Sequence, residues 1–117
     1  MKIFFATLLL ASAQFAAAAT SPTFPSDVSA FLDRRESCDH WRGEEGYDKE
    51  RQADIDWSIC QSCPGTDREL AGLKKKYQSN PKILKALAEF EVTIEPADKA
   101  AAKKFCSTTR KPDWVEQ

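Results

Sequence analysis

Large apolar side chains are scarce in this chain once its first 19 residues are set aside. From residue 20 to residue 117 it holds three valines, four isoleucines, five leucines and four phenylalanines. That share lies below the roughly 20 % at which chains tend toward disorder. The small net charge of −1, the three tryptophans and the four cysteines argue against disorder. The composition therefore predicts one small domain whose thin core is supported by disulfides.

β-strand patterning is also lacking. No stretch alternates apolar and polar residues with a sustained period of two, and there is no internal repeat and no heptad run. The sequence predicts an all-α fold, a single small domain of four to five short helices stapled by two disulfides, over residues 26–106. We expect a flexible lead-in over residues 20–25 and a tail over residues 107–117, which Trp114 anchors.

The helices are placed by the spacing of apolar residues and by residues that cap or interrupt helices. Thr66 and Glu69 have the spacing of a capping box, in which each side chain binds a free amide at the start of a helix. Asn80 followed by Pro81 is a second start signal, because proline suits the first helical position. The expected helix starts are Ser26, Asp48, Thr66, Asn80 and Pro96.

The first 19 residues have the anatomy of a secretory signal peptide. A positive start at Lys2 precedes an apolar run over residues 3–10, and Ala17-x-Ala19 offers a cleavage site. A membrane-spanning helix needs about 20 predominantly apolar residues, whereas polar residues interrupt this stretch. We therefore expect cleavage after Ala19, a periplasmic or secreted mature chain, and no stable membrane anchor.

Charge is distributed unevenly along the chain. Residues 20–67 carry five basic and eleven acidic side chains, whereas residues 68–117 carry eleven basic and seven acidic ones. Such asymmetry is typical of a protein that binds a partner of one charge sign, although the two halves of one fold can also complement each other. A slightly acidic exported chain does not suit nucleic acid. The partner expected for the acidic half is a basic protein.

The four cysteines allow three disulfide pairings. Cys38–Cys63 together with Cys60–Cys106 would tie the first helix to the second and clamp the terminal helix. Cys38–Cys106 together with Cys60–Cys63 remains open. Either scheme fits an exported domain with a small core, because disulfides form and persist outside the cytoplasm.

Cys60 and Cys63 also allow a redox interpretation. Catalytic dithiols of this spacing open a helix, whose dipole lowers the thiol pKa, whereas this pair closes a helix and precedes Pro64. A zinc site is a further alternative, because Cys38 and His40 could join the pair as ligands. Oxidation competes for the thiols in an exported protein, so we expect no metal and no cofactor.

The segment from residue 38 to residue 47 is the densest in functional groups. It holds the only histidine of the chain, and tryptophan, tyrosine and arginine are favoured at binding hot spots. No nucleophile for His40 can be identified nearby, so we expect no catalytic residue. The structural alternative is that Trp41 packs over a disulfide and Arg42 pairs with an acid. The residues expected to form a contact surface are Asp39, His40, Trp41, Arg42, Glu44, Glu45 and Tyr47.

The stretch FLDRRESCDHWRGE at residues 31–44, followed by CPGTDREL at residues 63–70 and by a Lys-Lys-Lys-Tyr run, resembles a group of small exported bacterial proteins of unknown function. The resemblance covers about residues 31–95 and is most specific at the Cys-Asp-His-x-Arg-Gly-Glu segment. It implies secretion and a helical disulfide domain, and it implies no activity. It also implies that Cys38 pairs with Cys63, which leaves the other two cysteines for each other.

Residues 67–70, Asp-x-Glu-Leu, are similar to a stretch of small periplasmic lysozyme inhibitors, from which the chain departs at Leu73. Lysozyme-like targets are often cationic, which suits the acidic first half. The expected function is therefore an inhibitor-like, non-enzymatic binding module of the bacterial envelope that engages a basic protein. The alternatives are an exported thiol-redox or metal-binding protein that uses Cys60 and Cys63 with His40, and a purely structural envelope protein.

Overall fold

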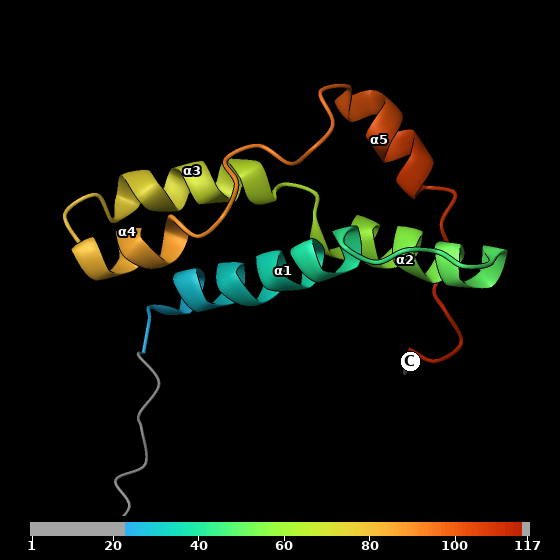
Figure 1. Cartoon of the computed structure of the whole chain (residues 1–117). Coiled ribbons are helices and arrows are strands. Elements are labelled where there is room, and N and C mark those ends of the chain that lie inside the picture. Colours follow the sequence, from blue (N-terminus) through green and yellow to red (C-terminus); the bar gives the residue numbers. More distant parts are fainter. Residues whose placement is uncertain (1–22, 116–117) are drawn as a thin grey trace, which may run out of the picture.

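The computed structural model describes residues 23–115, which form a single small all-α domain (Figure 1). The predicted signal peptide at residues 1–19 lies outside this range. Within residues 23–115 no residue belongs to a β-strand, and no helix is long and apolar enough to cross a membrane. The helices are α1 (Ser26–Arg42), α2 (Lys49–Ser62), α3 (Thr66–Lys76), α4 (Pro81–Leu87) and α5 (Lys99–Cys106).

The hydrophobic core lies between α1, α3 and α4. Val28 and Phe31 are three residues apart on α1, which places both on one helix face, and both are fully buried. Phe90 packs its ring edge-on against Phe31 at a centroid distance of 5.5 Å. Complete burial of one such side chain contributes about 1.5–3 kcal/mol. The other buried residues of this core are Leu70, Leu73, Ile83 and Leu87.

Two disulfides connect α2 and α5 to the rest of the domain. Cys38, buried on α1, bonds to Cys63 at the C-terminal end of α2, and Cys60 bonds to Cys106 at the end of α5. The pairing implied by the resemblance is confirmed. Loops that span 25 and 46 residues contribute about 3.5 and 4 kcal/mol when closed in this way, by the chain-entropy model. No residue of α5 is fully buried, so this crosslink is the main attachment of that helix.

Side-chain caps define three of the helix starts. Asp48 and Asn80 each accept a hydrogen bond from the amide three residues ahead, at 2.8 and 3.2 Å, which confirms both predicted starts. The predicted start of the last helix at Pro96 is wrong, because α5 begins at Lys99. Its cap is Asp98, whose carboxylate accepts from the amide three residues ahead at 2.9 Å.

The capping box predicted at Thr66 and Glu69 is not formed. The residue that precedes α3 is Gly65, whose φ of +83° lies in the left-handed region that glycine adopts without strain. The Thr66 hydroxyl donates instead to the carbonyl of Cys63 (2.7 Å), and Glu69 pairs with Arg34 on α1 (3.1 Å). Glu69 therefore pairs with a distant residue on α1, and the Thr66 hydroxyl bonds within the turn that precedes α3.

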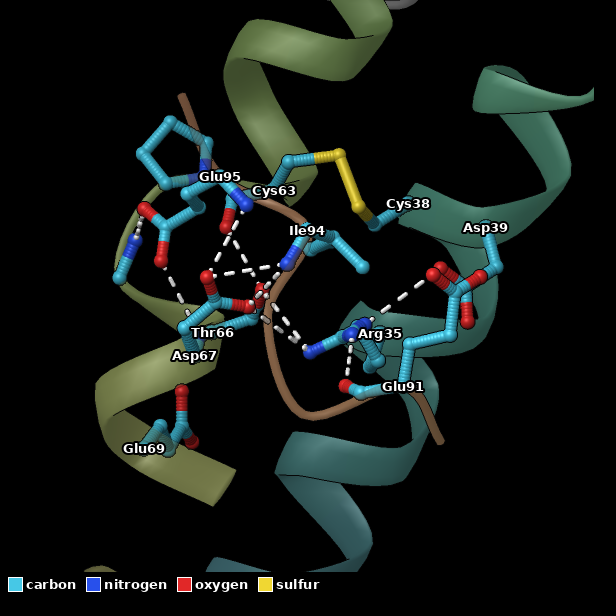
Figure 2. A network of polar contacts seen from close by, with 12 residues as sticks. Arg35, Cys38, Asp39, Cys63, Thr66, Asp67, Glu69, Glu91, Ile94 and Glu95 are labelled. Atoms are coloured by element: carbon cyan, nitrogen blue, oxygen red, sulfur yellow. Dashed lines mark hydrogen bonds and ion pairs between the residues drawn. A yellow bond between two sulfur atoms is a disulfide. The ribbon is translucent and has the colours of Figure 1, made fainter. Parts of the chain in front are cut away.

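The amides at the start of α3 are capped by a residue far away in the sequence (Figure 2). The Glu95 carboxylate accepts hydrogen bonds from the amides of Gly65 (2.6 Å) and Asp67 (3.1 Å). In return, the Asp67 carboxylate accepts from the amides of Ile94 and Glu95, both at 3.0 Å. The loop that follows α4 is thereby held against the first turn of α3.

Arg35 is a fully buried cation that links α1 to this loop. Its guanidinium donates to the carbonyl of Glu91 (2.6 Å) and lies 3.6 Å from the Asp67 carboxylate, as Figure 2 shows. Asp39, one turn along α1, is a further partner at 3.4 Å. A buried charge without partners costs several kcal/mol, so the contact with the Glu91 carbonyl holds the start of this loop against α1.

Candidate binding surface

The predicted contact residues lie on the last turn of α1 and on the loop over residues 43–48 that leads into α2 (Figure 1). They are therefore close in space as well as in sequence, and they lie away from the core between α1, α3 and α4. Some of their side chains make internal contacts and others face solvent. That difference decides which of them can contact a partner.

Asp39 and Arg42 belong to the internal ion-pair network. Arg42 Nη1 donates to Asp39 Oδ1 at 3.0 Å, and the same oxygen lies 3.4 Å from Arg35 Nε. Arg42 also lies 3.9 Å from the Glu91 carboxylate. Arg42 therefore pairs with acidic side chains, as expected if its role is structural. Asp39 helps to compensate the buried charge of Arg35.

His40 and Glu44 lie one helical turn apart. His40 Nε2 is 3.5 Å from Glu44 Oε1, while Arg51 on α2 donates to Glu44 Oε2 at 3.2 Å. The His40 side chain remains 61 % exposed. Glu44 therefore joins α1 to α2, and His40 is its solvent-facing neighbour.

Trp41 is the centre of an aromatic and cationic stack. The ring of Trp114 lies nearly parallel to it, with a centroid distance of 6.1 Å and an interplanar angle of 23°. The Arg51 guanidinium lies 5.2 Å from the Trp41 ring, and His40 packs edge-on at 5.3 Å. Trp114 thus anchors the tail by stacking on Trp41, as the sequence predicted.

Glu45 and Tyr47 are the freest of the predicted contact residues. Tyr47 is 83 % exposed, and neither side chain takes part in a hydrogen bond or ion pair within residues 23–115. A Cβ at Gly46, between them, would overlap the Gln52 side chain, so the loop runs close along α2 at this point. Both side chains are thus presented to solvent by a loop whose backbone lies against a helix.

A cavity of about 430 Å³ opens beside this surface, between α1, α2 and the C-terminal segment. All three tryptophans of the chain line it: Trp41 from α1, Trp57 from α2 and Trp114 from the tail. We refer to it as the tryptophan cavity. The sequence did not indicate it, because Trp57 alone looks like part of an apolar helix face. Its polar lining residues are Arg34, Ser37, Ser58, Gln61 and Ser62.

A larger groove, of about 700 Å³, lies beside both disulfides, between α2, α5 and the loop that joins α4 to α5. Phe105 is 51 % exposed within it, and Arg42 and Lys103 contribute cations to its lining. The apolar residues of the lining are Ile59, Pro64, Ile94, Pro96, Ala101, Ala102 and Phe105.

The clearly shifted pKa values of the described chain belong to three residues where α1 begins and α3 ends. The Asp27 carboxylate accepts hydrogen bonds from Lys76 Nζ (2.6 Å) and from the Tyr77 hydroxyl (2.8 Å). These bonds, that of Lys76 foremost, lower the pKa of Asp27, and Asp27 in turn raises the pKa of Lys76 and of Tyr77. The cluster ties two helices together and lies outside the contact surface.

The cysteines offer no dithiol in the part of the chain that the structure describes. Cys60 and Cys63 belong to two different disulfides, and no described cysteine is free. Among residues 23–115 no group of three or more histidine, cysteine or acidic side chains is placed to hold a metal ion.

No protein-family model, no curated protein and no solved structure matches this chain. Fold and surface together define a small helical domain crosslinked by two disulfides. Such crosslinks indicate an oxidising compartment outside the cytoplasm.

Proposed function

We propose that this protein is a non-enzymatic, inhibitor-like binding module of the bacterial envelope, and that it engages a basic protein partner. The contact surface comprises the loop over residues 43–48 with the adjoining turns of α1 and α2. A periplasmic or secreted location is supported by the two closed disulfides and by the signal-peptide pattern of residues 1–19.

The charge of this region supports a basic partner. Residues 44–56 hold six carboxylates and two basic side chains, and one of these two, Arg51, is already paired with Glu44. The lysine-rich helices α3, α4 and α5 supply the compensating positive charge elsewhere. An acidic surface accelerates encounter with a basic protein, and the effect weakens as salt is added.

The observation that carries the proposal is the exposure of Tyr47. Its ring is 83 % exposed on a loop that also presents Glu45. Tyrosine is enriched at binding hot spots because its large rigid ring loses little conformational entropy and its hydroxyl can hydrogen-bond. Tyr47 is thus the anchor, and the carboxylates steer the partner toward it. Trp41, another of the predicted contact residues, is part-buried and stacks on Trp114, so it offers a partner less surface than Tyr47 does.

The test is capture of a partner from an envelope extract by the disulfide-bonded protein, followed by affinity and rate measurements with that partner purified. Tyr47→Ala and Glu45→Gln are the informative variants, because neither side chain has a hydrogen-bond or ion-pair partner among residues 23–115. We expect Tyr47→Ala to cost about 2 kcal/mol of binding free energy, the size of a hot spot. We expect Glu45→Gln to slow association at low salt and to matter little at high salt.

Matched controls come from the segment that follows α4, outside the loop over residues 43–48. Val92→Ala truncates a side chain of a residue that is 66 % exposed, and Glu89→Gln removes one exposed carboxylate. Both should bind like the unmodified protein. Equal affinity and equal association rates for all four variants contradict the proposal, and so does failure to capture any saturable partner.

A further inference from the structure

We propose that the tryptophan cavity binds a neutral saccharide ring, at a site that adjoins the contact surface at Trp41 and does not include Tyr47. The cavity is shallow and widely open to solvent, and its volume of about 430 Å³ lies within the range of roughly 300–1,000 Å³ typical of small-ligand pockets. Its lining combines indole rings with hydroxyl, amide and guanidinium groups.

The lining follows from helix geometry and from the tail. Trp57 and Gln61 are four residues apart on α2, so their side chains lie on the same face. On α1, Arg34 and Trp41 are seven residues apart, close to two turns, and they line the same cavity. The tail adds Trp114, which stacks on Trp41. Three separate segments thus converge on one hollow.

Ser58 indicates that the cavity receives a polar ligand. The residue is only 4 % exposed, and its hydroxyl has no hydrogen-bond partner within the described chain. Its neighbour Ser62 is satisfied, because that hydroxyl donates to the carbonyl of Ser58 at 2.7 Å. Nearly all buried polar groups in native proteins have a partner. The Ser58 Oγ is itself buried, so the side chain turns toward the cavity when a ligand binds, and a ligand hydroxyl can then both donate to it and accept from it.

The tryptophans suit the apolar faces of a sugar ring. A pyranose presents flat patches of C–H groups, which pack on aromatic rings, and a rim of hydroxyls, which need donors and acceptors at the edge of those rings. Trp57 is partly buried, and Trp114 is 56 % exposed although Trp41 stacks against it. Gln61, exposed at the border of the cavity, adds an amide that can donate and accept.

Other ligand classes fit this lining less well. An anion needs a free cation, and Arg34 already donates to Glu69 at 3.1 Å and to two backbone carbonyls. A cationic ligand would find no carboxylate among the described residues that line the cavity. A purely apolar ligand would leave the Ser58 hydroxyl without a partner, which is unfavourable.

Intrinsic fluorescence tests the proposal, because every tryptophan of the chain lines the cavity. The disulfide-bonded protein is titrated with three neutral disaccharides: N,N′-diacetylchitobiose, cellobiose and maltose. We expect a saturable change in emission with at least one of them, with a Kd of about 1 mM or below. No saturable change with any of the three overturns the proposal.

Two variants separate binding from folding. Ser58→Ala removes a hydroxyl that has no protein partner, and Trp114→Ala truncates a largely exposed ring of the tail, so both should keep the helical circular dichroism of the unmodified protein. We expect each to weaken saccharide binding at least about tenfold, measured by calorimetry. Val92→Ala, an exposed position outside the cavity, is the control and should bind normally. Unchanged affinity in both cavity variants overturns the assignment, as does an equal loss in the control.

Discussion

Asp67 and Glu95 cap each other's backbone across 28 residues of sequence. The Glu95 carboxylate accepts from the amide of Asp67 at 3.1 Å, and the Asp67 carboxylate accepts from the amide of Glu95 at 3.0 Å. The first pair of atoms lies at the N-terminus of α3, where free amides and the helix dipole favour negative charge. Because Arg35 also reaches Asp67, one buried cation and two carboxylates join three segments of the fold.

The first prediction concerns this reciprocal cap. Glu95→Ala removes the acceptor of two amide hydrogen bonds, from Gly65 and Asp67, at a helix start. We expect the free energy of unfolding to fall by about 2 kcal/mol, as for loss of a strong cap, measured by urea denaturation. Glu89→Ala is the control, because an exposed position usually changes stability by less than about 0.5 kcal/mol. Equal stabilities of the two variants would show that the cap contributes nothing.

The second prediction concerns the buried cation. Arg35→Met keeps most of the apolar volume but leaves the Glu91 carbonyl without its donor and the Asp67 carboxylate without its cation. Breaking a buried pair in this way costs about 3–5 kcal/mol. We expect a loss of that size in urea denaturation, whereas Arg68→Met, at an exposed position of α3, should stay close to the unmodified protein. A Met variant as stable as the parent protein would contradict the role given to Arg35.

Local signals predicted much of the fold. Asp48 and Asn80 bind amides only three residues ahead, so their sequence context is enough to place two helix starts. The cap from Glu95 and the burial of Arg35 could not be predicted in the same way. Their partners on other segments are 28 to 56 residues away, and nothing local marks them. The predicted capping box failed for this reason, since Glu69 found a partner on α1.

The site was predictable only in part. The segment from residue 38 to residue 47 was recognised from its density of polar and aromatic groups, but sequence could not separate exposed Tyr47 from stacked Trp41. The tryptophan cavity forms only where α1, α2 and the tail meet, so Trp57 and Ser58 carried no signal of their own. A usable hint was the presence of three tryptophans in a chain with few large apolar residues.

The third prediction concerns α5. Replacing both Cys60 and Cys106 by serine removes the main attachment of a helix that has no fully buried residue. We expect α5 amides to lose their hydrogen-exchange protection while amides of α1 and α3 around the core keep theirs. The comparison is the variant in which both Cys38 and Cys63 are replaced by serine. Because Cys38 is buried on the core-facing side of α1, amides around the core should lose protection in that variant as well. The same exchange pattern in both double variants would contradict this division.

The fourth prediction concerns pH. Hydrogen bonds from Lys76 and Tyr77 lower the pKa of Asp27 below its usual 3.8, so the unfolded chain binds that proton more tightly than the folded one. The resulting stability is complete above pH 3.8 and is lost as the pH falls through the lower folded pKa. We expect Asp27→Asn to make the acid side of the stability–pH profile shallower, measured by chemical denaturation at a series of pH values. Parallel profiles for the two proteins would contradict this assignment.

The raised pKa values of Lys76 and Tyr77 act at the other end of the scale. Their contribution is complete below the usual values of 10.5 and 10.0 and is lost as the pH rises through the higher folded values. The Asp27→Asn variant lacks this contribution from the start. As the pH rises through this alkaline range, it should therefore lose less stability than the parent protein does. If Asp27→Asn changed only the acid side of the stability–pH profile, the Asp27 carboxylate would be acting without Lys76 and Tyr77.

The four cysteines form structural crosslinks, which hold the proposed contact surface in place. The decisive measurement is a non-reducing peptide map of the native protein, with the chain cleaved between Cys60 and Cys63. We expect Cys38 joined to Cys63, Cys60 joined to Cys106, and no titratable thiol. A disulfide between Cys60 and Cys63, or two free thiols at these positions, would contradict this structural role and favour thiol-redox or metal chemistry.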